Sequence, residues 1–190
     1  MLLLLSAVSV YSHPHVFVEA SAGIEFQDGN PAAVHVRWVF DDFFSRMILL
    51  DFAGGADTLT EQHIESIRTG AFENLRDYNY FTHILLEGDA LNISKVQDFH
   101  VDVDGRSLIY SFRIPLQQPG GTDISNLSRI NELVVGLYDN SYYSYFDYPG
   151  EPITFQGNVP ASVQYDQRER PDRRYYFGLI VPEMFHIRWN

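Results

Sequence analysis

The amino-acid sequence predicts a mainly β protein of the α+β class, an antiparallel β-sandwich with a helical hairpin inserted between strands. Apolar and polar residues alternate over long stretches, and turn residues separate these stretches at short intervals. Between residues 41 and 77 the apolar spacing changes to that of a helix. Immunoglobulin-like domains are one such sandwich, and the 190-residue chain is 45% hydrophobic, which is enough to fill its core.

The strongest strand signal lies near the start of the chain. Every even-numbered residue between 16 and 26 is apolar, the period of a strand with one buried face. Turn residues occupy positions 28–31, and the alternation resumes over residues 34–40. These stretches predict an antiparallel hairpin in which Glu25 faces His35, and this cross-strand pair explains the histidine better than metal binding does.

Two helices are predicted in the insertion. Asp41 and Asp42 are favourable N-cap residues before apolar residues at helical spacing. Thr58 and Glu61 have the spacing of a capping box, and apolar residues three or four apart follow them. The helices should form a hairpin.

The rest of the chain is predicted to form strands. Residues 99–103 and 108–112 flank an Asp-Gly turn and predict a second hairpin. Further strands are expected at Tyr80–Leu86, Glu132–Tyr138, Ile153–Phe155, Ala161–Tyr165 and Phe185–Trp189. The arginine-rich stretch from Gln164 to Arg174 interrupts the pattern, and we expect a solvated connector or a partner-facing loop.

Residues 1–12 have the features of a signal peptide. Leu2–Val10 is an apolar run far shorter than the ~20 residues that span a bilayer, and Val10 and Ser12 supply small side chains for cleavage before His13. A buried N-terminal strand is the alternative. We expect an exported, soluble periplasmic protein whose mature chain, residues 13–190, forms one domain without a membrane span.

Composition excludes several function classes. The formal net charge of −12 opposes binding to nucleic acid. Because the chain has no cysteine, a metal site must use histidines, carboxylates or the chain terminus. A Gly-x-Ser-x-Gly elbow, a phosphate loop and a His-Glu-x-x-His zinc helix are all absent from the sequence, which favours a binding or accessory protein over an enzyme.

Several motifs occur in an order that resembles a known bacterial family. They are His13–Glu19 (His-Pro-His-Val-Phe-Val-Glu), Arg37–Ser45, Asn74-Leu75 with Tyr78 and Tyr80–Thr82, and Tyr138-Asp139 with Tyr142, Tyr143 and Phe146. The family has a domain of unknown function and is catalogued as the periplasmic component of an uncharacterised ABC-type transport system. Its members tend to be encoded near nickel, cobalt or zinc transporters, so the resemblance implies handling of a metal ion together with a membrane metal transporter.

One stretch departs from that family. Its members often have a loop between the two helices that looks like an EF-hand calcium site. Here residues 51–57 read Asp-Phe-Ala-Gly-Gly-Ala-Asp, which lacks oxygen ligands at the third and fifth positions of such a loop. Calcium binding is therefore not expected.

The candidate metal ligands are His13 and His15. After cleavage, the α-amine and imidazole of His13 can chelate one ion, and His15 lies two residues further along an extended chain. Pro14 has no backbone N–H, so the square-planar mode that needs a deprotonated amide is blocked. The remaining brace suits zinc, nickel, cobalt or copper. The alternative is that the motif only orders the first strand.

Two further hypotheses about function remain. A copper brace at His13 would suit an oxidoreductase, and a purely structural or interaction module needs no metal. Tyr138, Tyr142, Tyr143 and Phe146 form an aromatic cluster that either lines a ligand pocket or fills the sandwich core.

Overall fold

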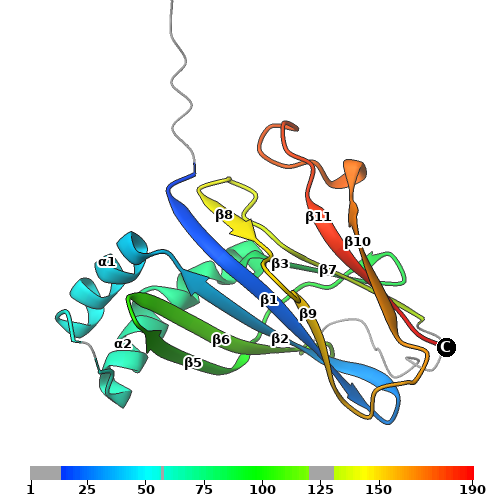
Figure 1. Cartoon of the computed structure of the whole chain (residues 1–190), viewed down its shortest axis with the longest axis horizontal. Helices are drawn as coiled ribbons and strands as arrows, with labels where there is room; N and C mark the ends of the chain where they lie inside the picture. Colours follow the sequence, from blue (N-terminus) through cyan, green and yellow to red (C-terminus); the bar gives the residue numbers. More distant parts are fainter. Residues whose placement is uncertain (1–13, 57, 120–130) are drawn as a thin grey trace, which may run out of the picture.

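The computed structural model describes residues 14–56, 58–119 and 131–190, and these form two facing β-sheets with helices at one side (Figure 1). The first sheet has the strand order β5-β6-β2-β1-β8, and β9 also pairs with β1. Its strands are β1 (Val16–Gln27), β2 (Asn30–Phe40), β5 (Gln97–Asp104), β6 (Ser107–Pro115), β8 (Ser144–Asp147) and β9 (Ile153–Gly157).

The second sheet has the order β10-β11-β7-β3-β4, and its pairings are all antiparallel. Its strands are β3 (Thr82–Leu86), β4 (Asp89–Ala90), β7 (Glu132–Leu137), β10 (Gln164–Glu169) and β11 (Glu183–Arg188). The mainly β sandwich that the alternating sequence predicts is therefore confirmed.

Strand β1 is paired along both of its edges. It pairs antiparallel with β2 along its length, as the hairpin pattern predicts. On its other edge it pairs in parallel with β8 through Val16–Glu19 and with β9 through Ala22–Phe26. Gly157 ends β9 with a φ of +83°, and a Cβ there would collide with the carbonyl oxygen of Phe26. The two parallel pairings make the first sheet mixed, because β8 and β9 return from far along the chain.

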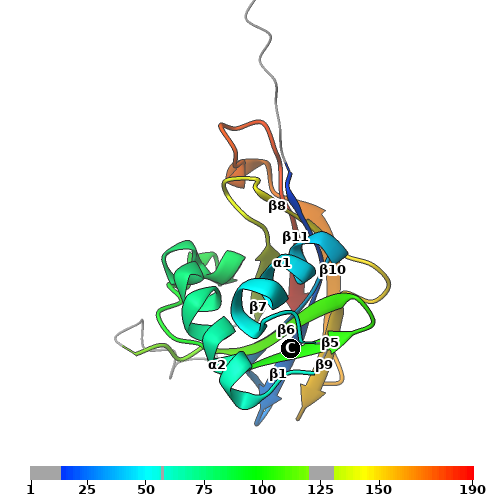
Figure 2. The same ribbon diagram turned by 90° about the vertical axis from the view of Figure 1, so that its left-hand side faces the viewer.

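The helices lie between β2 and β3 in sequence and at the β5–β6 side of the first sheet (Figures 1 and 2). They are α1 (Asp42–Ala53), α2 (Glu61–Gly70) and the 3-10 segment η1 (Phe72–Phe81). Asp41 caps α1 as predicted, since its carboxylate accepts the backbone N–H of Phe44 at 2.9 Å. The cap of α2 is Thr60, paired with His63, and not Thr58, so the predicted capping box was placed two residues too early.

Ser45 ties α1 to the first sheet. Its side chain is fully buried, donates to the carbonyl of Asp41 at 2.6 Å and accepts the backbone N–H of Leu108 at 2.8 Å. The insertion is thus bonded to the start of β6.

The hydrophobic core fills the space between the sheets and continues beneath the helices. Trp38 of β2 is 1% exposed, and its ring meets Phe112 at 5.0 Å and Phe146 at 5.6 Å between ring centroids. Under the helices, Phe72 stacks on Phe99 at 4.0 Å. One continuous aromatic core therefore packs the two sheets and the helices against one another.

Several boundaries and registers differ from the sequence prediction. The β1–β2 register differs from the prediction, because Gln27 pairs with Asn30 across a turn at Asp28-Gly29, and Gly23 and not Glu25 lies opposite His35. A bulge between Glu25 and Phe26 shifts this register by one residue. Tyr80 belongs to η1, and β3 begins only at Thr82. The stretch expected to be a connector contains β10, which begins at Gln164 and not at residue 161.

Candidate functional site

The candidate metal site begins at the entry to β1. His13 lies outside the described residues. His15 is exposed, and its ring centroid lies 5.0 Å from that of Tyr143. The backbone N–H groups of His15 and Val16 both point to the carbonyl oxygen of Tyr143, at 2.8 and 3.2 Å. The main chain is thus fixed at His15, while its imidazole lies at the surface.

Asp41 fixes the next residue of the strand. Its carboxylate accepts the backbone N–H of Phe17 at 2.8 Å, and its own N–H donates to the Phe17 carbonyl at 3.0 Å. The same carboxylate caps α1 through its other oxygen. One side chain therefore aligns the start of β1 with the end of β2, and its two oxygens are occupied by backbone amides.

The buried carboxylate of Asp139 stabilises the turn to which the backbone of His15 is hydrogen-bonded. Asp139 is 2% exposed and accepts the N–H and the hydroxyl of Ser141 at 2.8 and 2.7 Å and the N–H of Ser144 at 3.0 Å. These bonds fold residues 139–144 between β7 and β8 and so place the carbonyl of Tyr143 beside β1. The sequence motif Tyr138-Asp139 thus has a structural role that spacing alone did not reveal.

The four aromatic residues considered as a ligand pocket lie in different surroundings. Phe146 is buried between the sheets, and Tyr138 is buried on the outer face of β7. Tyr142 contacts the rings of Tyr175 and Tyr176 at 6.3 and 5.4 Å, whereas Tyr143 is 48% exposed. The structure brings Tyr138 and Tyr142 to the same ring, that of Tyr175, which lies 4.8 Å from Tyr138 in a loop that sequence reasoning did not connect to them.

The other histidines serve the fold. His35 bonds Glu25 at 2.7 Å, His100 lies 3.2 Å from Asp102, and His63 caps α2. His83 stacks on Tyr138 at 3.8 Å, and burial lowers its pKa to about 4, although a hydrogen bond to the Tyr138 carbonyl opposes this shift. It is therefore neutral at neutral pH.

Glu25 is the centre of an ion-pair network on the outer face of the first sheet. Arg113 binds its carboxylate through two nitrogens at 2.9 and 3.1 Å, and His35 adds a third contact. The hydrogen bonds from Arg113 and then from His35 lower the pKa of Glu25 to about 2. Gly23 lies opposite His35 and leaves room for the imidazole to reach diagonally to Glu25.

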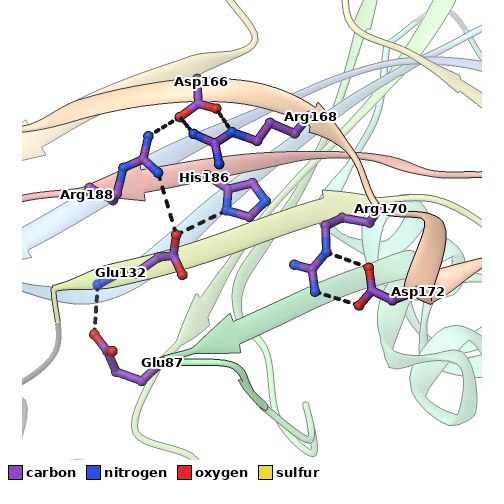
Figure 3. Close-up of polar contacts among 8 residues, drawn as sticks. All are labelled: Glu87, Glu132, Asp166, Arg168, Arg170, Asp172, His186 and Arg188. Carbon is purple, nitrogen blue, oxygen red and sulfur yellow. Dashed lines mark hydrogen bonds and ion pairs between the residues drawn. The ribbon is translucent and has the colours of Figure 1, made fainter.

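A second polar network crosses three strands on the outer face of the second sheet (Figure 3). Glu132 of β7 lies 3.1 Å from His186 Nδ1 and 3.9 Å from Arg188, both on β11. Arg188 and Arg168 converge on Asp166 of β10. Because each charge faces an opposite one, this network joins strand to strand.

His186 is the residue of this network whose hydrogen bonds are not all made. The side chain is 10% exposed, and its buried Nε2 atom has no hydrogen-bond partner among the described residues. A shallow pocket of about 390 Å³ is lined by His83, Tyr138, Asn140, Asp172 and Arg173.

Among residues 14–56, 58–119 and 131–190, no three His, Asp or Glu side chains form a group that could hold a metal ion. In the stretch that departs from an EF-hand, Ala53 is buried and Gly54 closes α1 in a left-handed conformation. No helix in the same described part is long and apolar enough to cross a bilayer.

Comparison with known proteins places the chain in a family. A family model described as a protein of unknown function (DUF1007) matches residues 1–174. The chain belongs to the DUF1007 family. A protein from Spirochaeta aurantia, described as an uncharacterized 15.5 kDa protein in the trpE 3'region, is 23% identical over 146 residues, which cover 76% of this chain and 99% of that protein. The DUF1007 match includes the entry to β1 and the Asp139 turn, and it ends before β11.

Proposed function

We propose that this DUF1007 protein is an exported periplasmic accessory protein that binds a divalent transition-metal ion, zinc, nickel, cobalt or copper, at its mature N terminus. In this proposal it serves a membrane metal transporter. The observation that carries the proposal is the position of His15, which is exposed at the entry of a strand whose backbone is fixed on both sides. An ordered backbone lowers the entropic cost of bringing ligands together.

The ligand set explains why such a site would suit transfer of an ion. The α-amine and imidazole of His13 and the imidazole of His15 give three nitrogens, which are donors that these metals accept well. A set of three nitrogens leaves a coordination position for water or for a ligand from the partner. We therefore infer that the bound ion can be exchanged with the transporter, as its transfer requires.

Isothermal titration of zinc and nickel into the processed protein tests this proposal. We expect His13→Ala and His15→Ala each to weaken binding by at least tenfold. His100→Ala is the matched control, because His100 is also exposed on a strand but lies 3.2 Å from Asp102, and it should leave the affinity unchanged.

A form with one extra residue before His13 separates two kinds of site. It keeps both imidazoles but moves the amine, so the terminal chelate predicts a loss of affinity. Because the ligands must be deprotonated, binding should weaken as the pH falls through ~6.5. Equal affinity in the native protein, both alanine variants and the extended form would refute the site.

A further inference from the structure

We propose that the turn between Tyr175 and Ile180 is a membrane-docking element that inserts Phe177 and Leu179 into the interfacial region of an anionic lipid bilayer. This inference concerns a different site from the N-terminal histidines and does not depend on metal binding. We refer to residues Tyr176, Phe177, Gly178 and Leu179 as the aromatic tip. It lies beyond the residues that match the DUF1007 family.

The exposure of the aromatic tip is the first observation. Phe177 is 93% exposed, more than any other large hydrophobic residue of the described chain, and Leu179 is 62% exposed. Tyr175 and Ile180 form the bridge that closes the turn, with the N–H of Tyr175 donating to Ile180 at 3.0 Å. Solvent exposure of a neighbouring Phe and Leu has a free-energy cost, and such apolar patches mark surfaces that bind membranes or proteins.

The backbone of the tip is the second observation. Tyr176, Phe177 and Gly178 have positive φ angles of 48°, 58° and 79°. For residues with a side chain, this left-handed conformation is unfavourable, and sites of this kind cluster at functional loops. The strain gains no burial for Phe177, so the turn presents this ring to the outside at the expense of fold stability.

Tyrosines surround the tip on the side of the molecule where β1 begins. The loop lies beside the turn before β8, at the end of the sandwich where the chain enters β1 (Figures 1 and 2), and ring contacts join Tyr142 to Tyr175 and Tyr176. Tyr143 and Tyr145 are 48% and 41% exposed at this end. Tyrosine rings are enriched where proteins meet lipid headgroups.

Charge distinguishes a lipid surface from other occupants. The chain has 25 acidic and 13 basic residues, yet residues 170–180 contain three arginines and one aspartate. Asp172 is paired with Arg170 at 2.7 Å, which leaves the half-buried Arg173 and the exposed Arg174 as the net charge of the segment. Basic residues next to an apolar, protruding tip match both the headgroups and the apolar interior of an anionic bilayer, which distinguishes this occupant from a purely polar partner.

Vesicle co-sedimentation measures the proposed contact. With vesicles of phosphatidylethanolamine and phosphatidylglycerol, we expect the double variant Phe177→Ser, Leu179→Ser to bind at least about 100-fold more weakly than the native chain, because neither position then buries an apolar side chain in the bilayer. Arg173→Gln with Arg174→Gln should weaken binding to these vesicles several-fold and leave binding to phosphatidylcholine vesicles unchanged.

The control is the double variant Phe43→Ser, Leu50→Ser on α1, where the native side chains are 76% and 58% exposed. It removes similar exposed apolar surface away from the tip and should bind as the native chain does. All variants carry the same N terminus, so any contribution of the apolar residues 2–10 cancels. Equal loss in the control, or unchanged binding of the tip variant, overturns the proposal.

A fluorescent reporter gives an independent readout. The native Trp38 and Trp189 are 1% and 5% exposed and should not respond to lipid. In Phe177→Trp, a blue shift of emission with anionic vesicles is expected. An unchanged spectrum would overturn insertion, and so would a tip variant whose only change is a loss of self-association in sedimentation velocity, because the occupant would then be a second copy.

Discussion

Replacement of Asp139 by asparagine tests how the entry of β1 is held. Asp139 is 2% exposed and accepts three hydrogen bonds, two on one carboxylate oxygen from Ser141 and one on the other from the N–H of Ser144. Asparagine has nearly the same shape and keeps one oxygen. Its amide group, however, would place a donor against at least one buried donor.

The magnitude follows from these contacts. Loss of one bond to a charged acceptor costs about 1.5–3 kcal/mol, and a buried donor left without an acceptor costs a similar amount. We therefore expect Asp139→Asn to reduce the free energy of unfolding by about 2–3 kcal/mol. For a chain of this length, 1 kcal/mol lowers the melting temperature by about 2–4 °C, so the expected decrease is about 4–12 °C.

Thermal unfolding followed by circular dichroism measures this difference, with Asp147→Asn as the matched control. Asp147 is an exposed carboxylate on β8, close in sequence to the same turn, so its substitution should change stability by less than about 0.5 kcal/mol. Hydrogen exchange should also show faster exchange at the Ser144 amide in Asp139→Asn alone. If both variants melt together, the turn does not depend on the buried carboxylate and the reasoning fails.

Three further predictions concern the fold. Ser45→Ala should cost about 1–3 kcal/mol in urea unfolding because it leaves a buried amide of β6 without an acceptor, whereas Ser66→Ala, which also removes a bond to the carbonyl four residues earlier, should cost little. Because the pKa of Glu25 falls from 4.5 to about 2 on folding, the ionised side chain should stabilise the fold by about 1–2 kcal/mol above pH 4.5 and lose this contribution between pH 4.5 and pH 2. In Glu25→Gln, the free energy of unfolding should therefore decrease less over this pH range. Gly157→Ala should cost about 3 kcal/mol or more in thermal unfolding, since its Cβ meets a carbonyl of β1, while Gly29→Ala, with a similar φ and open space, should cost about 1 kcal/mol.

The sequence patterns predicted the features of this fold that depend on residues close together in the chain. The alternation of residues 16–26 and the turn after them are sufficient to predict the β1–β2 hairpin, and Asp41 is recognisable as a cap. The bulge between Glu25 and Phe26 is not visible in the sequence, because alternation along one strand does not specify which residue the partner strand skips, here Ala32. The strand predicted at Ala161–Tyr165 was placed too early, because β10 (Gln164–Glu169) is an exposed edge with no apolar alternation.

In the candidate site, too, contacts between residues far apart in the chain could not be predicted. The motif at residues 13–15 is readable from the sequence, but its neighbour Tyr143 is not, since the two lie more than a hundred residues apart and meet through the parallel pairing of β1 with β8. The network of Glu132, His186 and Asp166 likewise needs three strands to be aligned. Chemistry that depends on strand order cannot be found from spacing along the chain.

The pairing of β1 along both of its edges also determines when this protein can fold. The strand is complete after the first 27 residues, but its second edge is satisfied only by residues 144–157. A chain synthesised from its N terminus therefore holds a long, half-paired strand until most of its length has been made. Folds with such distant pairings form slowly, in milliseconds to seconds, and their exposed strand edges invite wrong partners in the meantime. A chain stopped before residue 144 would carry β1 and β2 as an open sheet, so fragments of this protein should aggregate where the whole chain does not.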